Sequence, residues 1–135
     1  MKHHALFVVI SMASAISFST AVRADPCEAS LPKPGTQFDG TVRYVGDGDS
    51  LCVGKTSDPR TWIEVRAEDF YAPELHAPGG REAKSALERV AFGKPIHCLA
   101  GKRSYDRVVA KCSVGGTPIA DLMRREGVSE GGRGR

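Results

Sequence analysis

The chain has 135 residues with 19 basic and 16 acidic side chains, and its length and composition fit one small domain with a modest core. Two of the basic residues lie in the first 24 positions, so the remainder has 17 basic against 16 acidic side chains, a net charge of +1. A bulk positive charge is therefore excluded as an argument for nucleic-acid binding, and any anion site must be local.

The first 24 residues have the pattern of a secretory signal peptide. Lys2 gives a positive start, an apolar and small-residue stretch follows, and the sequence VRA precedes Asp25 as a cleavage site. The most apolar part is short for a membrane span, although an uncleaved anchor is the alternative that the same pattern leaves open. We expect cleavage near Ala24 and a secreted or periplasmic protein of about 111 residues, with no membrane span in the mature chain.

The rest of the chain divides into short segments separated by proline, glycine and polar residues. In order, we predict an irregular lead-in at 25–37, two strands around an acidic turn at 38–55, a strand at 60–70, a loop at 71–80, a helix at 81–93, two strands at 95–100 and 107–115, a short helix at 117–127 and a disordered tail at 129–135. The segment 38–128 would form the folded domain.

Apolar periodicity supports two of these elements in particular. In the strand at 60–70, Ile63 and Val65 alternate with Glu64 and Arg66, which is typical of a half-buried strand. The helix at 81–93 has an i, i+3, i+4, i+7, i+8 stripe, followed by the helix-ending residues of the segment 93–95. Its members are Ala83, Ala86, Leu87, Val90 and Ala91.

The last predicted helix begins with Thr117 as a favourable N-cap and Pro118 in the first turn, and it ends at Gly127. Five strands with a helix between the third and the fourth fit an OB-fold, a small β-barrel, with two helices in all. Other α+β folds are the alternative that this pattern leaves open.

Four cysteines follow the predicted cleavage site, and in an exported chain we expect disulfides rather than four reduced thiols. Cys98 and Cys112 lie on the two strands that flank the segment 101–106, so a hairpin would place them opposite each other. Cys27 would then pair with Cys52 and tie the lead-in to the barrel.

Several polar residues together suggest phosphodiester chemistry. Asp47 and Asp49 of the sequence DGDS suit a hard cation, and Glu74 could take a proton from water. Arg66 and Arg107 provide planar guanidinium groups that match phosphate geometry. Each feature alone has an ordinary explanation, since DGDS is commonly a turn and the other residues could simply face water.

In combination, these features resemble the staphylococcal nuclease (thermonuclease) family over about residues 38–130. The matching stretches are VGDGDSLCV, IEVRAEDFYAPEL, GGREAKSALERV, SYDRVVAKCSVGG and IADLMRREGVSE. The resemblance implies an OB-fold and Ca²⁺-dependent cleavage of DNA and RNA. It implies that Asp49 and the backbone carbonyl of Ala72 hold the metal, that Glu74 is the base or positions water, and that Arg66 and Arg107 hold the scissile phosphate.

The sequence departs from this family in two places. Tyr71 stands where the family has an aspartate that is the second carboxylate ligand, and a neutral phenol is a poor Ca²⁺ ligand. Asp69, two residues earlier, could substitute if a bulge brings it inward. The family also continues past GVSE with an aromatic stretch and a third helix, whereas this sequence reads GGRGR.

The sequence therefore favours a secreted Ca²⁺-dependent nuclease, weakened by Tyr71, with DNA or RNA as its substrate. One alternative is a catalytically inactive nuclease-like OB module that binds nucleic acid or a protein partner. Another is an accessory role in exopolysaccharide (succinoglycan) production, under which some family members are filed. Tyr71 favours the alternatives, and the retained acids and arginines favour the enzyme. The sequence specifies neither an oligomeric state nor a preference between DNA and RNA.

Overall fold

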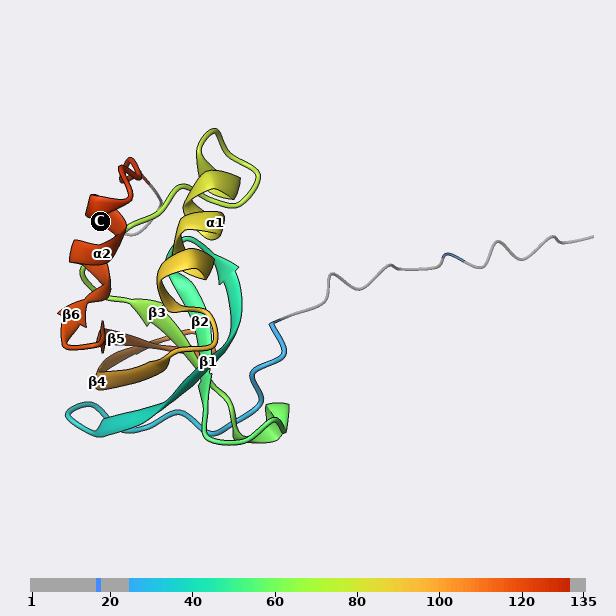
Figure 1. Ribbon diagram of the computed structural model, residues 1–135. Helices are drawn as coiled ribbons and strands as arrows, with labels where there is room; N and C mark the ends of the chain where they lie inside the picture. The colour runs from blue at the N-terminus through green and yellow to red at the C-terminus, as the bar shows by residue number, and fades with distance from the viewer. Residues whose placement is uncertain (1–16, 18–24, 132–135) are drawn as a thin grey trace, which may run out of the picture.

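The computed structural model describes residue 17 and residues 25–131, so the predicted signal peptide lies almost entirely outside the described part (Figure 1). The elements in chain order are β1 (Gln37–Asp47), β2 (Ser50–Gly54), a single 3₁₀ turn η1 (Pro59–Thr61), β3 (Ile63–Ala67), α1 (Gly80–Ala91), β4 (Pro95–Ser104), β5 (Arg107–Val114), β6 (Thr117–Pro118) and α2 (Ile119–Arg125). The predicted order of five strands and two helices is confirmed, and the structure adds η1 and the two-residue strand β6, which were not predicted.

The six strands form one mostly antiparallel sheet in the order β3-β2-β1-β4-β5-β6. One further pairing joins β3 to β5 in parallel, with Val65 opposite Val108, so that five strands close into a ring. The long strand β1 makes this possible, because its first half pairs with β4 and its second half with β2. The result is a barrel-like arrangement, and both helices lie towards one end of it (Figure 1).

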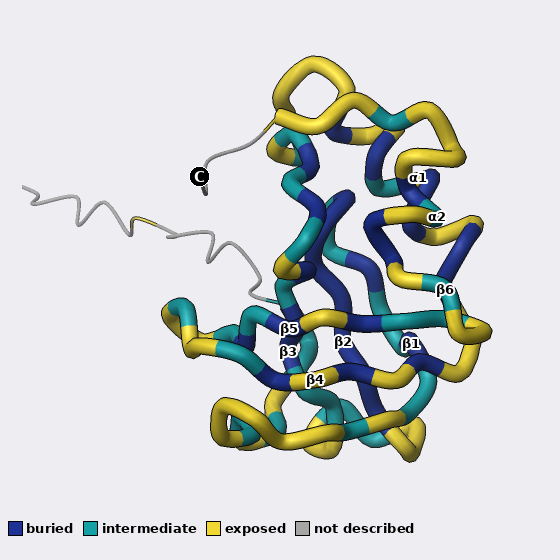
Figure 2. The backbone as a smooth tube through the Cα atoms, turned by 90° about the vertical axis from the view of Figure 1, so that its left-hand side faces the viewer, coloured by how far each residue is buried: buried dark blue, intermediate teal, exposed yellow. Residues whose placement is uncertain are grey.

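The core fills the space between the strands and the inner sides of the two helices (Figure 2). All five residues of the predicted apolar stripe of α1 are buried, which confirms that prediction. The bulkiest fully buried side chains include Phe70, Leu87, Ile119 and Met123. Full burial of a side chain of this size is worth about 1.5–3 kcal/mol, so Leu87 of α1 and Ile119 and Met123 of α2 contribute to holding the helices against the core.

The start of α2 differs from the prediction. Thr117 is not the N-cap, because it pairs with Val114 in the two-residue strand β6. Pro118 occupies the cap position without a side-chain hydrogen bond, and the helix begins at Ile119. The turn between β5 and β6 keeps Thr117 extended, and its hydroxyl therefore has no helix to cap.

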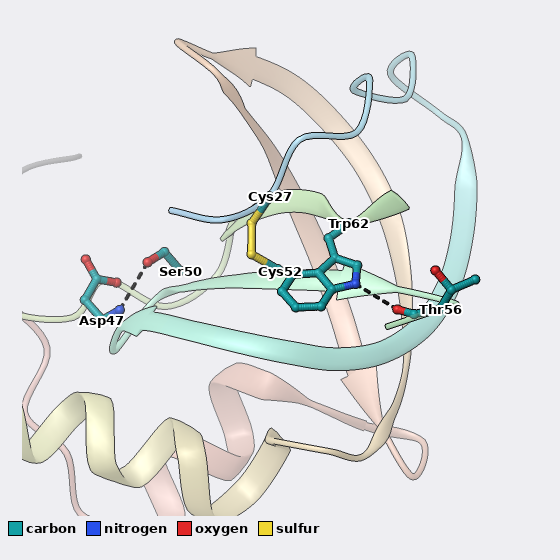
Figure 3. The surroundings of a disulfide bond; sticks show 6 residues. All are labelled: Cys27, Asp47, Ser50, Cys52, Thr56 and Trp62. Atoms are coloured by element: carbon teal, nitrogen blue, oxygen red, sulfur yellow. Dashed lines mark hydrogen bonds between the residues drawn. A yellow bond between two sulfur atoms is a disulfide. The ribbon is translucent and has the colours of Figure 1, made fainter. Parts of the chain in front are cut away.

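Both predicted disulfides are confirmed. Cys98 is the direct cross-strand partner of Cys112, with Cα atoms 4.1 Å apart, and Cys27 is bonded to Cys52 with Cα atoms 5.7 Å apart (Figure 3). Within the described residues, no helix has the length and apolarity needed to cross a bilayer. Two disulfides are compatible with an extracellular or periplasmic protein.

The irregular lead-in lies along the outside of the barrel. Besides the disulfide, the amide of Glu28 donates to the carbonyl of Pro59 at 3.0 Å, and that of Ala29 donates to Trp62 at 2.9 Å. This contact corrects the prediction that β3 is half-buried. Glu64, on its outward face, is only 8% exposed, because its cross-strand partner Cys52 carries the disulfide that holds the lead-in over it.

The tail also differs from the prediction at its first residues. Residues 129–131, expected to be disordered, have defined positions, and the amide of Gly131 donates to the carbonyl of Tyr71 at 2.9 Å. This bond places the end of the described chain beside the loop that follows β3. The remainder of the predicted tail, 132–135, lies outside the described residues.

Candidate functional site

The acidic turn between β1 and β2 is built by its own side chains. The Oδ1 atom of Asp47 accepts the amide of Asp49 at 3.1 Å, and the hydroxyl of Ser50 accepts the amide of Asp47 at 3.2 Å (Figure 3 shows the second bond). These bonds form a tight Asx-type turn. As a result Asp49 points inward and is only 6% exposed.

Gly48, at the tip of this turn, packs against two other segments. A Cβ atom there would lie 2.5 Å from the Cβ atoms of both Ala72 and Ala83. Only a residue without a side chain fits at such a distance. The turn, the loop after β3 and the first part of α1 are therefore in direct contact.

The carboxylate of Asp49 is where three segments of the chain meet. Its Oδ2 atom accepts the backbone amide of Ala72 at 3.0 Å, from the loop after β3. The Nη2 atom of Arg66, at the end of β3, lies 4.0 Å from the same oxygen. Asp49, Arg66 and Ala72, all predicted as site residues from the sequence, are thus neighbours in the fold.

Burial, together with the charge of the nearby Asp47 carboxylate and a hydrogen bond to it, raises the pKa of Asp49 from its ordinary value to about 7. The amide of Ala72 and the guanidinium of Arg66 act in the opposite direction, because both stabilise the charged form. A carboxyl group in this balance is easily ionised by an added positive charge.

Tyr71 lies beside this group in an arrangement that the sequence analysis did not foresee. The Cζ atom of Arg66 lies over its ring, 5.6 Å from the ring centre. The spacing of five residues between the two side chains gave no signal, because it follows neither strand nor helix periodicity. The contact forms because the loop after β3 folds back over the end of that strand.

Glu74 and Arg107 form no hydrogen bond or ion pair with Asp49 within residues 25–131. Glu74 is exposed, two residues beyond Ala72, and its carboxylate has no hydrogen bond or ion pair within residues 25–131. Arg107 is half-buried at the start of β5, which pairs with β3. Its positive charge lowers the pKa of Glu64, so the two side chains are close enough for their charges to interact. The roles expected for Glu74 and Arg107 stay predictions.

Asp69 is not seen in contact with the Asp49 group in the described part of the chain. Its Oδ1 atom is buried without a hydrogen-bond partner there, and its backbone carbonyl accepts Nη2 of Arg124 at 3.0 Å. The carbonyl therefore faces α2. The role of Asp69 as a substitute ligand stays a prediction.

A second buried carboxyl group was missed by the sequence analysis. Burial raises the pKa of Glu64 to about 7, with further contributions from a hydrogen bond with Asp25 and from the charge of Asp106, while Arg107 opposes the shift. Asp25, Glu64 and Asp106 line one hollow beneath the lead-in. The predicted Cys27–Cys52 disulfide was the signal that could have located it, since it places the lead-in beside Glu64.

The donor atoms around Asp49 decide whether a metal fits. In the part of the chain that is described, no three histidine, cysteine, aspartate or glutamate side chains gather closely enough to hold an ion. The carboxylate of Asp49 and the carbonyl of Ala72 are nevertheless oxygen donors of the kind that Ca²⁺ prefers. The carboxylate of Asp47 beside Asp49 adds negative charge. The residues thus fit a hard cation in chemistry, with few ligands.

Comparison with known proteins gives no assignment. No protein-family model matches the chain, and no curated protein matches it in sequence.

Proposed function

We propose that this protein is a secreted phosphodiesterase of the thermonuclease type, with an OB-fold barrel, that hydrolyses DNA or RNA in the presence of Ca²⁺. The observation that supports it best is the meeting of Asp49, Ala72 and Arg66 at one point, from segments up to 23 residues apart. A buried carboxylate, a loop backbone and a guanidinium are the groups that a phosphate and its counter-ion require.

In this proposal the two arginines bind the scissile phosphate. Arg66, at the end of β3, and Arg107, on the adjacent strand, offer N–H groups to the non-bridging phosphate oxygens. Their charge opposes the negative charge that grows on these oxygens as the nucleophile approaches. Lysine would keep that charge, but it would lose the planar fork that fixes the phosphate orientation.

Glu74 accepts a proton in the same proposal. Its carboxylate takes the proton from a water molecule whose oxygen forms a bond to phosphorus, while the bond from phosphorus to the leaving oxygen breaks. The leaving oxygen takes its proton from solvent. The exposed position of Glu74 suits contact with bulk water and with a long substrate that lies across the surface.

Asp49 and the carbonyl of Ala72 would hold the metal ion. When bound, Ca²⁺ would supply positive charge to the phosphate oxygens and to the attacking water. With one carboxylate ligand and Tyr71 in place of another, we expect weak affinity, about 10⁻⁴–10⁻³ M, as in other sites with few charged ligands.

The test is cleavage by the purified mature protein. Single-stranded DNA and RNA would be incubated with millimolar Ca²⁺ or with a chelator, and products separated by gel electrophoresis. We expect cleavage with Ca²⁺ only. A Glu74→Gln preparation, purified identically, controls for contaminating nuclease. Absence of cleavage of both substrates by folded protein would reject the proposal.

A second candidate function is binding of nucleic acid without hydrolysis. The contact of Arg66 with the ring of Tyr71 favours it, because an aromatic surface next to a cation stands where the resemblance implies a ligand. In the same assay, this function predicts a shift of the intact oligonucleotide in a native gel and no cleavage products.

A further inference from the structure

Tyr71 stands where the resemblance implies a metal ligand, and its side chain also contacts Arg66. Its ring lies under the guanidinium of Arg66, at 5.6 Å from the ring centre, and its backbone is fixed by the bond from the amide of Gly131. The side chain of Arg66 is 16% exposed, and its Nη2 atom lies 4.0 Å from the carboxylate of Asp49. The guanidinium is thus placed between an aromatic face and a buried acid.

The way in which a ring contacts a guanidinium matters for phosphate binding. A cation–π contact draws the cation to the face of the ring, which carries no oxygen acceptor for the N–H donors of a guanidinium. The ring of Tyr71 therefore attracts the charge of Arg66 without the charge-assisted hydrogen bonds that a carboxylate would form with it. An aspartate at position 71 would instead accept hydrogen bonds from the same edge that a phosphate needs, and it would add a negative charge that repels the phosphate.

We propose that Tyr71 is a positioning residue for Arg66, and that the pair lets this site bind the phosphate of a single-stranded nucleic acid without a metal ion. The inference rests on the proposed function only in taking Arg66 as a phosphate ligand. It concerns binding, which can be measured without catalysis. The aromatic ring also offers a surface beside the phosphate on which a base can stack.

The test compares two substitutions of Tyr71 in the presence of a chelator. Binding of a fluorescently labelled single-stranded DNA octamer would be measured by fluorescence anisotropy in EDTA. Tyr71→Phe keeps the ring and should bind like the wild type. Tyr71→Leu removes the ring at similar bulk and should bind about 2- to 30-fold more weakly, the range to which a cation–π contact converts.

Two controls separate positioning from general damage. Tyr44→Leu removes a comparable ring from beside Lys84, whose Nζ atom lies 5.9 Å from the ring centre, and it should leave binding unchanged. Arg66→Lys should itself weaken binding. When Tyr71→Leu is added to the Arg66→Lys variant, it should cause no further loss of binding. Thermal unfolding followed by circular dichroism verifies that each variant is folded.

The outcomes for this inference and for the proposed function are distinct. Equal binding by the wild type and a folded Tyr71→Leu variant, or binding of the octamer only when Ca²⁺ is present, would overturn the positioning role even if the wild type cleaves DNA. Ring-dependent binding in EDTA, together with no cleavage under any condition, would support the positioning role and reject the nuclease.

Discussion

Asp49 and Glu64 are two buried carboxyl groups on one small barrel, and in both of them burial raises the pKa to about 7. Their surroundings differ. Asp49 receives a backbone amide from Ala72 and faces Arg66, at a point where three chain segments meet. Glu64 contacts Asp25 and lies beneath a segment that a disulfide ties to the barrel. Burial and a raised pKa therefore do not by themselves identify a catalytic acid, and the donors around the carboxyl group are the better criterion.

The strongest test of this difference is to remove the charge of Asp49 and, separately, the charge of Glu64. Asp49→Asn should reduce the proposed Ca²⁺-dependent cleavage to the level seen with a chelator, because the amide replaces the carboxylate that is proposed to hold the ion. Glu64→Gln should cleave like the wild type. Initial rates on single-stranded DNA give the answer. Equal losses in both variants would show that the two carboxyl groups are not functionally different.

Glu74→Gln should lower turnover by about 10²- to 10⁴-fold, since it removes the proton acceptor and preserves the shape of the side chain. Substrate binding should change much less. Separate determination of kcat and KM measures this. Glu82→Gln, a change at an acid in the first turn of α1, is the matched control. Unchanged kcat in Glu74→Gln would mean that Glu74 is an ordinary loop residue.

Removing the disulfide that covers Glu64 should affect stability rather than chemistry. A Cys27→Ser, Cys52→Ala double variant should lose about 2–5 kcal/mol of unfolding free energy, as is usual when a native disulfide is removed from a small domain. The bonds around Asp49 do not involve the lead-in, so cleavage per folded molecule should remain. Urea unfolding measures the loss of stability, and a cleavage assay at low temperature measures the activity of the folded variant. A folded variant without activity would show that the two regions depend on each other.

Tyr71→Asp adds a carboxylate at the position whose side chain contacts Arg66, the neighbour of Asp49. Ca²⁺ affinity should rise about tenfold, because it follows the number of charged ligands. Isothermal titration calorimetry measures the affinity, and cleavage should then reach saturation at lower Ca²⁺. A correctly folded Tyr71→Asp variant with wild-type Ca²⁺ affinity would exclude position 71 from the metal site.

The smallest expected effect is on the pH dependence of stability. The folded state holds the proton of Glu64 up to a pKa of about 7, above the ordinary 4.5, so the unfolding free energy contributed by this group falls as pH rises between these values. Glu64→Gln removes that fall and should gain stability relative to the wild type as pH increases. Thermal unfolding of the wild type and of Glu64→Gln at pH values below and above this range tests the prediction. An equal pH dependence of stability in the two proteins would contradict it.

Local patterns allowed much of the fold to be predicted. The stripe of α1 and the hairpin that brings Cys98 to Cys112 depend on residues close in sequence, and both are confirmed. The burial of Glu64 and the contact of Arg66 with the ring of Tyr71 were missed, because each depends on how an irregular segment lies over a strand. The roles of Glu74 and Arg107 came from the family resemblance, and they await the measurements above.

The packing at Gly48 restricts how this protein could change over evolutionary time. Its two contact partners, Ala72 and Ala83, are already the smallest residues that carry a side chain, so neither can shrink to make room except by becoming glycine. A single enlargement at any of the three positions would move the acidic turn, the loop and the helix apart together. Substitutions are therefore expected at Tyr71, which is only half-buried, before they are accepted at the tip of the turn.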